Sequence, residues 1–504
     1  MSLMLKCGNK YPEIMNVIRI SQAEEKFSSE VLDFTFMSVV TVIPLLNSHG
    51  FQKFSTSSSR CAAAAKSKKT LAREGLKNIV LIDGVRTPFL MSGTQYQSLM
   101  PHDLSRQSLL ELSRKLNLEK EAVEYISIGT VIQEVKTANI ARESALGAGF
   151  PDNIPAHTVT MACISSNQAV TSCIGYMHSG VYDACIAGGV EFMSDVPIRH
   201  SRQMRALMLK LNKAKTLGAR VSLLTKLSGK HFIPELPGVA EFSTNEIMGH
   251  SGDRLAAAFK VSREEQDEFA LRSHTLAHQA HQGGNFTDLV PFKVPGVSQV
   301  INKDNGIRVS TKEQMAKLKP AFIKPHGTVT AANASYLTDG ASACLICTEE
   351  KAKKMGWKPR AYLRDFVYTS QDPKDQLLLG PTYATPKVLD KAGLGVSDID
   401  VWEVHEAFAG QVLANLKAMD SDWFAKNYLK RESKVGSPPV DKLNNWGGSL
   451  SIGHPFGATG VRLLMHAANR LIKEDGQYAC VTACAAGGQG VGMVVERYPG
   501  ATVN

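Results

Sequence analysis

The amino-acid sequence predicts an α/β fold built from two copies of one unit. Strand-like and helix-like segments alternate along most of the chain, and this order favours a mainly parallel sheet with helices on both faces. Segments near the C-terminus also repeat earlier ones: SDIDVWEVHEAF resembles AVEYISIGTVIQE, and QYACVTACAAGGQGVGMVVE resembles YDACIAGGVEFMS. The copies lie roughly 270–300 residues apart, which is too far for a solenoid repeat and indicates two packed halves.

Composition and charge are those of a globular protein and argue against a nucleic-acid-binding one. The chain has 504 residues, of which 43% are hydrophobic and 21% are charged, and this length supports two or three domains with a sizeable core. The net charge of +10 consists of +5 from residues 1–73, +9 from residues 196–234 and −4 from the remainder. The basic charge is therefore local, and we expect no nucleic-acid partner.

The N-terminal region precedes the globular sequence. Residues 1–36 carry five acidic side chains without clear periodicity and indicate no function, so we expect an upstream extension or an alternative isoform. Residues 37–73 contain no acidic residue, several basic ones and a serine-rich stretch, which is typical of a mitochondrial transit peptide. We expect the mature chain to begin between about Arg60 and Lys77. The apolar run at 34–46 is too short to span a membrane.

Globular elements follow from Lys77 onward. NIVLIDGVRTPF reads as a buried strand that ends in a turn at Arg86. The patterns that follow predict a helix at 108–116, a strand at 125–134, a helix at 140–149 and a strand at 183–197.

A strand-to-helix turn around Cys163 offers the first candidate for chemistry. Residues 157–160 are β-branched and extended in character, whereas apolar residues after Cys163 recur with helical spacing until Gly180. Cys163 is therefore expected beside the free N–H groups of a first helical turn, a position that lowers a thiol pKa. A buried structural cysteine is the alternative at this point.

The segment 196–234 interrupts the alternation with nine basic residues and no acidic one. Its apolar residues are expected to form one helical stripe: Met204, Leu207, Met208, Leu211, Ala214 and Leu217. Such a basic amphipathic insertion suits either a membrane surface or a solvated helix that covers another domain. A longer helix is expected at 262–280, with Ser262 and Glu265 as its capping box.

The remaining cysteines resemble buried thiols rather than a disulfide framework. Nine cysteines show no regular spacing, so reduced thiols are expected. Cys344 and Cys347 form a CxxC, but ASACLICT reads as a buried strand, and we expect no metal site.

Three further residues join Cys163 as candidates. His454 lies in the second copy at the position that corresponds to Cys163, while His405 and Cys484 lie on loops at predicted strand ends. GHPFGATG lacks the lysine of a P-loop and GGQGVG fails the dinucleotide pattern, so neither predicts a nucleotide site. Four such residues at strand ends of a duplicated unit favour catalysis over a structural role.

The ordered motifs resemble those of the thiolase family over residues 77–498. VTMACISSNQAV is similar to the nucleophile signature, NNWGGSLSIGHPFGATG to the histidine signature and CAAGGQG to the second-cysteine signature. VRTPF, GGVEFMS, MGHSGDRLA, GTVTAANASYLTDGAS and HEAFAG fit further blocks in the right order. The chain has HEAF where most thiolases have NEAF, and it also carries the basic insertion. In both features it resembles the branch of long-chain 3-ketoacyl-CoA thiolases that are β-subunits of mitochondrial trifunctional complexes.

The resemblance implies a thiolase fold, with two βαβαβαββ halves packed as five αβαβα layers and an inserted loop domain. The N-terminal half would comprise residues 74–195 and 328–354, and the C-terminal half residues 355–504. The loop domain would span residues 196–327, with a membrane-associating insertion at 196–246.

The resemblance also implies residue roles in the CoA-dependent cleavage of a 3-ketoacyl-CoA. Cys163 would form the acyl-enzyme with His454 as its base, and Cys484 would be the second acid and base. His405 and His454 would polarise the thioester oxygen of the enolate, and the N–H groups of Cys163 and Ala486 would form a second oxyanion hole. CoA would be a co-substrate, with no permanently bound cofactor and no metal.

The expected partners follow from the same branch. We expect a dimer of this chain that pairs with α-subunits carrying hydratase and dehydrogenase activities, on the matrix side of the mitochondrial inner membrane. Binding to a lipid such as cardiolipin would use basic side chains of the insertion: Arg199, Arg202, Arg205, Lys210 and Lys213.

Two alternatives remain at this point. A ketoacyl synthase shares the duplicated fold and uses a Cys–His–His set, but it obtains its carbanion by losing CO2 and needs no second cysteine such as Cys484. A thiolase-fold lipid-binding protein without activity is the other, and it is disfavoured because all four reactive positions are filled.

Overall fold

The computed structural model describes residues 70–238 and 240–503. The predicted transit peptide and the extension before it fall almost entirely outside these residues. Residues 70–73 are described, and they contact the second half of the fold. The Leu71 N–H donates to Glu496 Oε2 at 3.1 Å, and Arg73 pairs with Asp365.

The first half contains the alternating elements that the sequence predicts. Its strands are β1 (Ile79–Arg86), β2 (Leu90–Met91), β3 (Tyr125–Gly129), β4 (Ala156–Val159), β5 (Ala184–Glu191) and β6 (Thr338–Thr348). Its helices are α2 (Pro101–Lys115), η2 (Lys120–Ala122), α3 (Ile140–Gly147), α4 (Ser165–His178) and α10 (Glu349–Met355).

The second half repeats this order. Its strands are β7 (Ala361–Ser370), β8 (Val401–Val404), β9 (Tyr478–Ala485) and β10 (Gln489–Arg497). Its helices are α11 (Gly380–Ala392), η4 (Val396–Asp398), α12 (Ala409–Met419), α13 (Asp422–Phe424), η5 (Ala425–Leu429), η6 (Val440–Lys442), α14 (Ser449–Ile452) and α15 (Thr459–Lys473).

The strand order shows the duplication directly. The hydrogen-bonded path runs β4-β3-β5-β6-β1-β7-β10-β9-β8, with β2 beside β6. In the first half β3 is parallel to β4 and β5, and β6 is antiparallel to β5 and β1; β8, β9, β10 and β7 repeat this pattern. The two halves join edge to edge because β1 pairs with β7 at Val80–Tyr362 and Leu81–Ala361, a contact that the sequence did not indicate.

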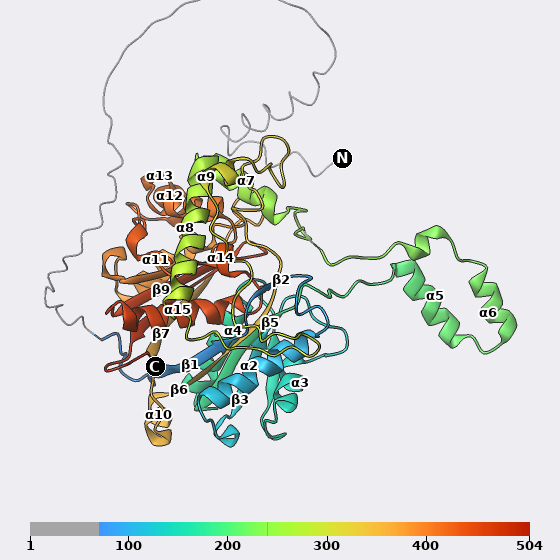
Figure 1. Cartoon of the computed structure of the whole chain (residues 1–504), viewed down its shortest axis with the longest axis horizontal. Helices are drawn as coiled ribbons and strands as arrows, with labels where there is room; N and C mark the ends of the chain where they lie inside the picture. Colours follow the sequence, from blue (N-terminus) through green and yellow to red (C-terminus); the bar gives the residue numbers. More distant parts are fainter. Residues whose placement is uncertain (1–69, 239, 504) are drawn as a thin grey trace, which may run out of the picture. The chain divides into compact units, whose positions relative to one another are not determined.

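Helices cover both faces of this arrangement (Figure 1). Helices α2 and α3 pack on the first half, and α11 and α12 on the second, while α4 and α15 contact each other between the halves. One apolar core accordingly combines residues of both halves, including Val170, Ile346, Val461 and Val481. The order is therefore outer helices, first half of the sheet, α4 and α15, second half of the sheet, outer helices. This is the five-layer α/β architecture that the resemblance implies.

Three strands are shorter than the sequence suggests. The strand predicted at 183–197 is β5, which ends at Glu191. The strand predicted at 125–134 ends at Gly129, because the N–H groups of Val131 and Ile132 donate to the Glu191 carboxylate instead of a neighbouring strand. Because His454 corresponds to Cys163, a strand is also expected before His454, but the segment there forms only an isolated bridge between Leu443 and Trp402. In the second half, α14 follows that bridge before the chain reaches α15.

The segment between β5 and β6 carries α5 (Arg202–Lys213), α6 (Leu217–Leu224), η3 (Gly229–Phe232), α7 (Met248–Ala258), α8 (Arg263–Gln282) and α9 (Lys312–Ala316). The capping box of α8 is confirmed: Ser262 Oγ accepts from the Glu265 N–H at 3.1 Å, and the Ser262 N–H donates to Glu265 Oε2 at 2.6 Å. These two bonds satisfy donors that the first turn of a helix leaves free.

The prediction of one continuous apolar stripe in the insertion is wrong in one respect. Helix α5 ends at Lys213, because Ala214 is extended, and Leu217 begins a separate helix. The stripe is therefore divided between α5 and α6, which pack against each other (Figure 1). Within the described part of the chain, no helix is long and apolar enough to cross a membrane.

Cys344 and Cys347 lie in β6 with fully buried side chains, as the strand interpretation predicted. Among the described residues, no group of three histidine, cysteine or acidic side chains is arranged to hold a metal ion.

Candidate active site

Cys163 lies in the turn between β4 and α4. The preceding residue, Ala162, has a φ of 47°, an uncommon conformation for a residue with a side chain. Ser165 holds the turn: its Oγ accepts from the Met161 N–H at 2.9 Å and donates to the Ala162 carbonyl at 2.6 Å. The local strand-to-helix pattern thus presents Cys163 just before the helix, as predicted.

The pKa of Cys163 differs from the sequence-based expectation. The position before α4 was expected to lower this pKa, but desolvation by burial raises it to about 12. The N–H groups of Ala486 and Cys163 act in the opposite direction, and Glu191 adds to the increase. The prediction of a net decrease is wrong, because desolvation of the thiol outweighs the effect of the Ala486 and Cys163 N–H groups. Cys163 is therefore a thiol at rest.

Cys484 lies inside β9, one residue from its end, and not on a loop as predicted; Ala486 follows the strand. The backbone N–H of Ala486 lowers the pKa of Cys163, which places this turn beside the Cys163 sulfur. Burial raises the pKa of Cys484, which is 1% exposed, and the neighbouring Cys163 adds to this increase. Gly487 and Gly488 have φ values of 83° and 67°, so this turn requires glycine. The N–H groups of Cys163 and Ala486 therefore lie around one sulfur atom.

His405 follows β8 and is completely buried. Its backbone N–H donates to the Thr482 carbonyl at 2.9 Å, which places it two residues from Cys484 on the neighbouring strand. Its Nδ1 lies 3.0 Å from Ser449 Oγ, and Arg462 Nη2 donates to the same Ser449 oxygen at 2.6 Å.

His454 lies in the turn between α14 and α15 and is 3% exposed. Its Nδ1 is 2.7 Å from Thr459 Oγ1, and Thr459 Oγ1 donates to the Pro455 carbonyl at 2.9 Å. The backbone N–H of His454 donates to Thr338 Oγ1 at 3.0 Å. The bond to Thr459 therefore orients the ring, and the bond to Thr338 holds the backbone that carries it.

The two imidazole rings face each other with centroids 4.1 Å apart. The Nε2 atoms of both His405 and His454 are buried and have no hydrogen-bond partner among the described residues. Desolvation lowers the pKa of His454 to about 3 and that of His405 well below its usual value, with Arg462 adding to both effects. Both rings are therefore neutral near pH 7, with one nitrogen each left for a ligand.

Contacts between α4 and α15 bring the two reactive turns together. Ser166 Oγ accepts from the Val461 N–H at 3.2 Å, and Gly460 leaves room for the Asn167 side chain. Cys163 precedes α4 and His454 precedes α15, so the duplicated turns meet at the interface of the halves. The structure places all four predicted side chains, Cys163, His405, His454 and Cys484, in one region.

Comparison with known proteins agrees with this arrangement. The sequence model of the thiolase N-terminal domain matches residues 79–350, and that of the thiolase C-terminal domain matches residues 357–497. The chain belongs to the thiolase family. Its fold is similar to the crystal structure of Bacillus anthracis acetyl-CoA acetyltransferase, with 31% identity, a TM-score of 0.71 and coverage of 84% of this chain and 99% of that one.

Relatives within the thiolase family include longer and more similar matches. The mitochondrial trifunctional enzyme subunit beta of Mus musculus is 66% identical over 472 residues, which cover 93% of this chain and 99% of that protein. A probable 3-ketoacyl-CoA thiolase of Caenorhabditis elegans is 61% identical over 435 residues, covering 86% and 97%. The human mitochondrial 3-ketoacyl-CoA thiolase in complex with CoA has a TM-score of 0.70 at 29% identity, covering 84% and 98%.

Glu191 is a residue of this thiolase site that the sequence interpretation did not single out. Its carboxylate, buried at the end of β5, accepts hydrogen bonds from the N–H groups of Val131, Ile132 and Gly457 at 2.9–3.1 Å. Desolvation nevertheless raises its pKa to about 7. Glu191 therefore connects the loop after β3 to the loop after His454, within electrostatic reach of Cys163.

Other supporting residues lay inside quoted motifs without being recognised. Ser449 and Thr459 belong to the histidine signature, and their closeness to His454 in the sequence was the available signal; nothing in the sequence connects Ser449 to His405. Glu241 is different: its carboxylate accepts from the Gly487 N–H at 2.9 Å, but no local pattern connects residues so far apart.

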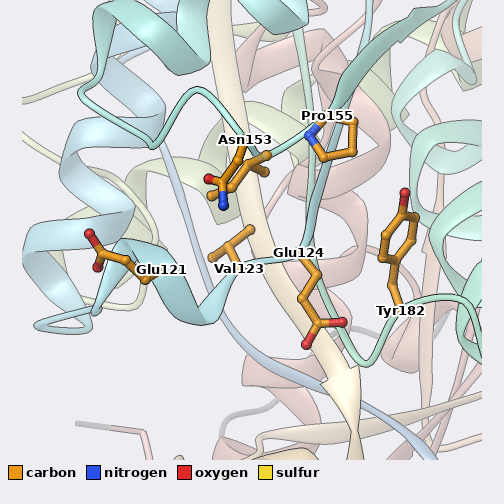
Figure 2. A pocket seen from close by; sticks show the side chains of 7 residues that line it. Glu121, Val123, Glu124, Asn153, Pro155 and Tyr182 are labelled. Atoms are coloured by element: carbon orange, nitrogen blue, oxygen red, sulfur yellow. The ribbon is translucent and has the colours of Figure 1, made fainter.

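A surface hollow lies on the opposite edge of the sheet. Residues that precede β3, β4 and β5 line it, as Figure 2 shows: Glu121, Val123, Glu124, Asn153, Ile154, Pro155 and Tyr182. Cys163 and His405 instead follow the carboxyl ends of β4 and β8, and Cys484 lies near the carboxyl end of β9, where α/β folds generally bind ligands. The hollow is therefore separate from the candidate active site.

Proposed function

We propose that this chain cleaves long-chain 3-ketoacyl-CoA with CoA, giving acetyl-CoA and a shortened acyl-CoA. Membership of the thiolase family supports acyltransferase chemistry, and the similarity to trifunctional enzyme beta subunits supports this substrate class. The observation that carries the proposal is the grouping of two cysteines and two neutral histidines around backbone N–H donors.

In the first half-reaction, His454 takes the proton of the Cys163 thiol as the sulfur attacks the keto carbon. The N–H groups of Cys163 and Ala486 stabilise the oxyanion that forms. The bond between the keto carbon and the α-carbon then breaks, and its electron pair forms the enolate of acetyl-CoA. Nε2 of His405 and of protonated His454 stabilise the enolate oxygen, and Cys484 donates a proton to the α-carbon.

In the second half-reaction, the Cys484 thiolate takes the proton of an incoming CoA thiol. The CoA sulfur attacks the acyl carbon on Cys163, and the Cys163–carbon bond breaks. Protonated His454 returns its proton to the departing Cys163 sulfur, so both cysteines end as thiols. CoA is a co-substrate throughout, as the CoA complex of a related human thiolase supports.

A product assay tests this reaction. The purified protein is incubated with 3-ketohexadecanoyl-CoA and CoA, and acetyl-CoA and tetradecanoyl-CoA are quantified. Equal amounts of the two products are expected. Without CoA, no tetradecanoyl-CoA is expected, and acetyl-CoA should not exceed one equivalent per active site, because only the first half-reaction can occur. Release of CO2 from a malonyl thioester would instead indicate a synthase, and binding without product would indicate an inactive lipid-binding protein.

We also propose that the chain forms a dimer and assembles with the α-subunit of a trifunctional enzyme. Strand β4 is at one end of the sheet, where β3 is its only strand neighbour within residues 70–238 and 240–503, and its four residues are partly exposed. Such an edge favours pairing with a second chain. The similarity to proteins named trifunctional enzyme subunit beta supports the heteromeric partner.

The proposed location is the matrix face of the mitochondrial inner membrane, with cardiolipin as a lipid partner. Relatives named mitochondrial support the organelle. Helices α5 and α6 support membrane binding, because they expose Met208, Leu209, Leu217 and Val221 beside basic residues. Of the predicted lipid-binding residues, Arg199, Arg202, Lys210 and Lys213 are exposed, whereas Arg205 is half-buried and pairs with Glu235 at 2.8 Å.

A further inference from the structure

We infer that His454 and His405 are held as opposite neutral tautomers, with the proton on Nδ1 of His454 and on Nε2 of His405. The inference rests on the proposed thiolase function, and it adds positioning roles for Thr459, Ser449 and Arg462. It follows from the directions of four hydrogen bonds, because a carbonyl oxygen can only accept and an arginine can only donate.

The tautomer of His454 follows from Thr459. Thr459 Oγ1 and the Pro455 carbonyl oxygen are 2.9 Å apart, and two oxygen atoms at that distance need a hydrogen between them. The carbonyl has none, so the single hydroxyl hydrogen of Thr459 lies there. Thr459 Oγ1 must then accept from His454 Nδ1 at 2.7 Å. His454 Nε2 is left with a lone pair, as a base for Cys163 requires.

The tautomer of His405 follows from Ser449 and has the opposite sense. Arg462 Nη2 donates to Ser449 Oγ at 2.6 Å, so this oxygen accepts there. The hydroxyl hydrogen of Ser449 then has one acceptor among the described residues, His405 Nδ1 at 3.0 Å. Protonation of His405 Nδ1 would leave that hydrogen buried without an acceptor, which is costly. His405 Nε2 therefore carries the proton.

Opposite tautomers suit the two tasks at this site. Before reaction, the unpartnered Nε2 atoms provide one acceptor, on His454, and one donor, on His405. After His454 has taken the Cys163 proton, both Nε2 atoms are donors and can stabilise the same enolate oxygen. If His405 had the other tautomer, its Nε2 lone pair would face the enolate and repel it.

Ser449→Ala tests the assignment through two separate signals. The variant removes the donor to His405 Nδ1, so α-proton exchange on acetyl-CoA should fall by about tenfold to a hundredfold. Alkylation of Cys163 by iodoacetamide, which depends on His454, should stay within about twofold of wild type. Ser449→Thr keeps the hydroxyl and should recover most of the exchange.

Ser451→Ala is the matched control, because it removes a buried hydroxyl from the same helix, where Ser451 contacts Ser273 instead of a reactive histidine. It should leave both signals unchanged. Exchange by Ser449→Ala at the wild-type rate would overturn the inference, as would equal loss of both signals in the two alanine variants.

A spectroscopic measurement is independent of turnover. In solid-state 15N NMR of histidine-labelled protein, the imidazole signal lost in His405→Asn should be the Nε2-protonated tautomer, and the signal lost in His454→Asn the Nδ1-protonated one. The same tautomer for both residues would contradict the inference. Absence of thiolysis by the wild type would contradict the proposed function alone, since these spectra report the tautomers without it.

Discussion

Gly460 lies directly against Asn167, where the first turn of α15 meets the first turn of α4. A Cβ atom on Gly460 would collide with the Asn167 side chain, so glycine is required for this approach. Cys163 lies just before one of these helices and His454 just before the other. The distance between nucleophile and base is therefore set by a contact between equivalent turns of the duplicated halves.

Gly460→Ala should consequently reduce thiolysis more than it reduces folding. The added methyl group pushes α15 away from α4, and small displacements of reacting groups can cost about a hundredfold in rate. Gly175→Ala in α4 is the control: no atom lies within 4 Å of its added Cβ, and alanine there should stabilise the helix by up to about 1 kcal/mol. Activity assays and urea unfolding of both variants check this, and equal activity in both would contradict it.

The raised pKa of Cys163 makes a second prediction. Because burial raises this pKa to about 12, the thiol should stay protonated throughout a titration from about pH 6 to 9. The ultraviolet absorbance of thiolate, measured as the difference between wild type and Cys163→Ala, should show no step in this range. A step with its midpoint near neutral pH would mean that Cys163 and His454 already form an ion pair before substrate binds.

The turn around Cys163 could be predicted because its signals are local. Extended residues before it and a helical apolar pattern after it lie within one short stretch. The pKa of the same residue could not, because it depends on burial in the folded chain and on groups distant in the sequence, such as Ala486 and Glu191. The end of β3 could not be predicted either. Val131 is typical of a strand, but its N–H donates to Glu191, sixty positions away.

The same contrast holds for the histidines. The signature motifs identified His405 and His454, but their tautomers depend on which partner donates each hydrogen bond. The decisive partner of Ser449 is Arg462, on a different helix. Sequence patterns therefore indicated which residues react, whereas hydrogen-bond directions indicate which ring nitrogen of each histidine carries the proton.

The third prediction concerns the membrane. Reversing four of the exposed basic residues of the insertion to glutamate should release the protein from cardiolipin-containing vesicles at physiological salt, because each basic residue near an anionic surface contributes about 1 kcal/mol. The residues are Arg199, Arg202, Lys210 and Lys213. Activity on a short soluble substrate should be unchanged.

A control variant separates local from overall charge. It reverses four exposed lysines elsewhere: Lys317, Lys319, Lys354 and Lys426. This control should float with vesicles as the parent does. If the insertion variant also floats, α5 and α6 belong to a protein interface.

The fourth prediction concerns processing. Leu71 and Arg73 contact Glu496 and Asp365, so removing them would expose part of the second half. The mature N-terminus should therefore lie between about Arg60 and Thr70, within the window expected from the transit-like composition. N-terminal sequencing checks this. Abundant precursor peptides from upstream of Met37 would contradict the view that residues 1–36 are an extension or alternative isoform.

The fifth prediction separates the two cysteines. Cys484→Ala should retain some acyl-enzyme formation while losing most α-proton exchange on acetyl-CoA, because Cys484 is the proposed proton donor to the α-carbon. Cys163→Ser should lose thiolysis and acyl capture, since an alcohol has almost no anion at neutral pH. Equal loss of both signals in both variants would mean that the roles are not divided in this way.

Trapping the acyl-enzyme tests whether Cys163 is the nucleophile. The protein is mixed with 3-ketohexadecanoyl-CoA without added CoA, quenched in acid and examined by peptide mass spectrometry. A tetradecanoyl group is expected on the peptide that contains Cys163; it should be lost when CoA is added before the quench and be absent from Cys163→Ser. An acyl group on another residue, or thiolysis by Cys163→Ser at the wild-type rate, would rule out Cys163 as the nucleophile.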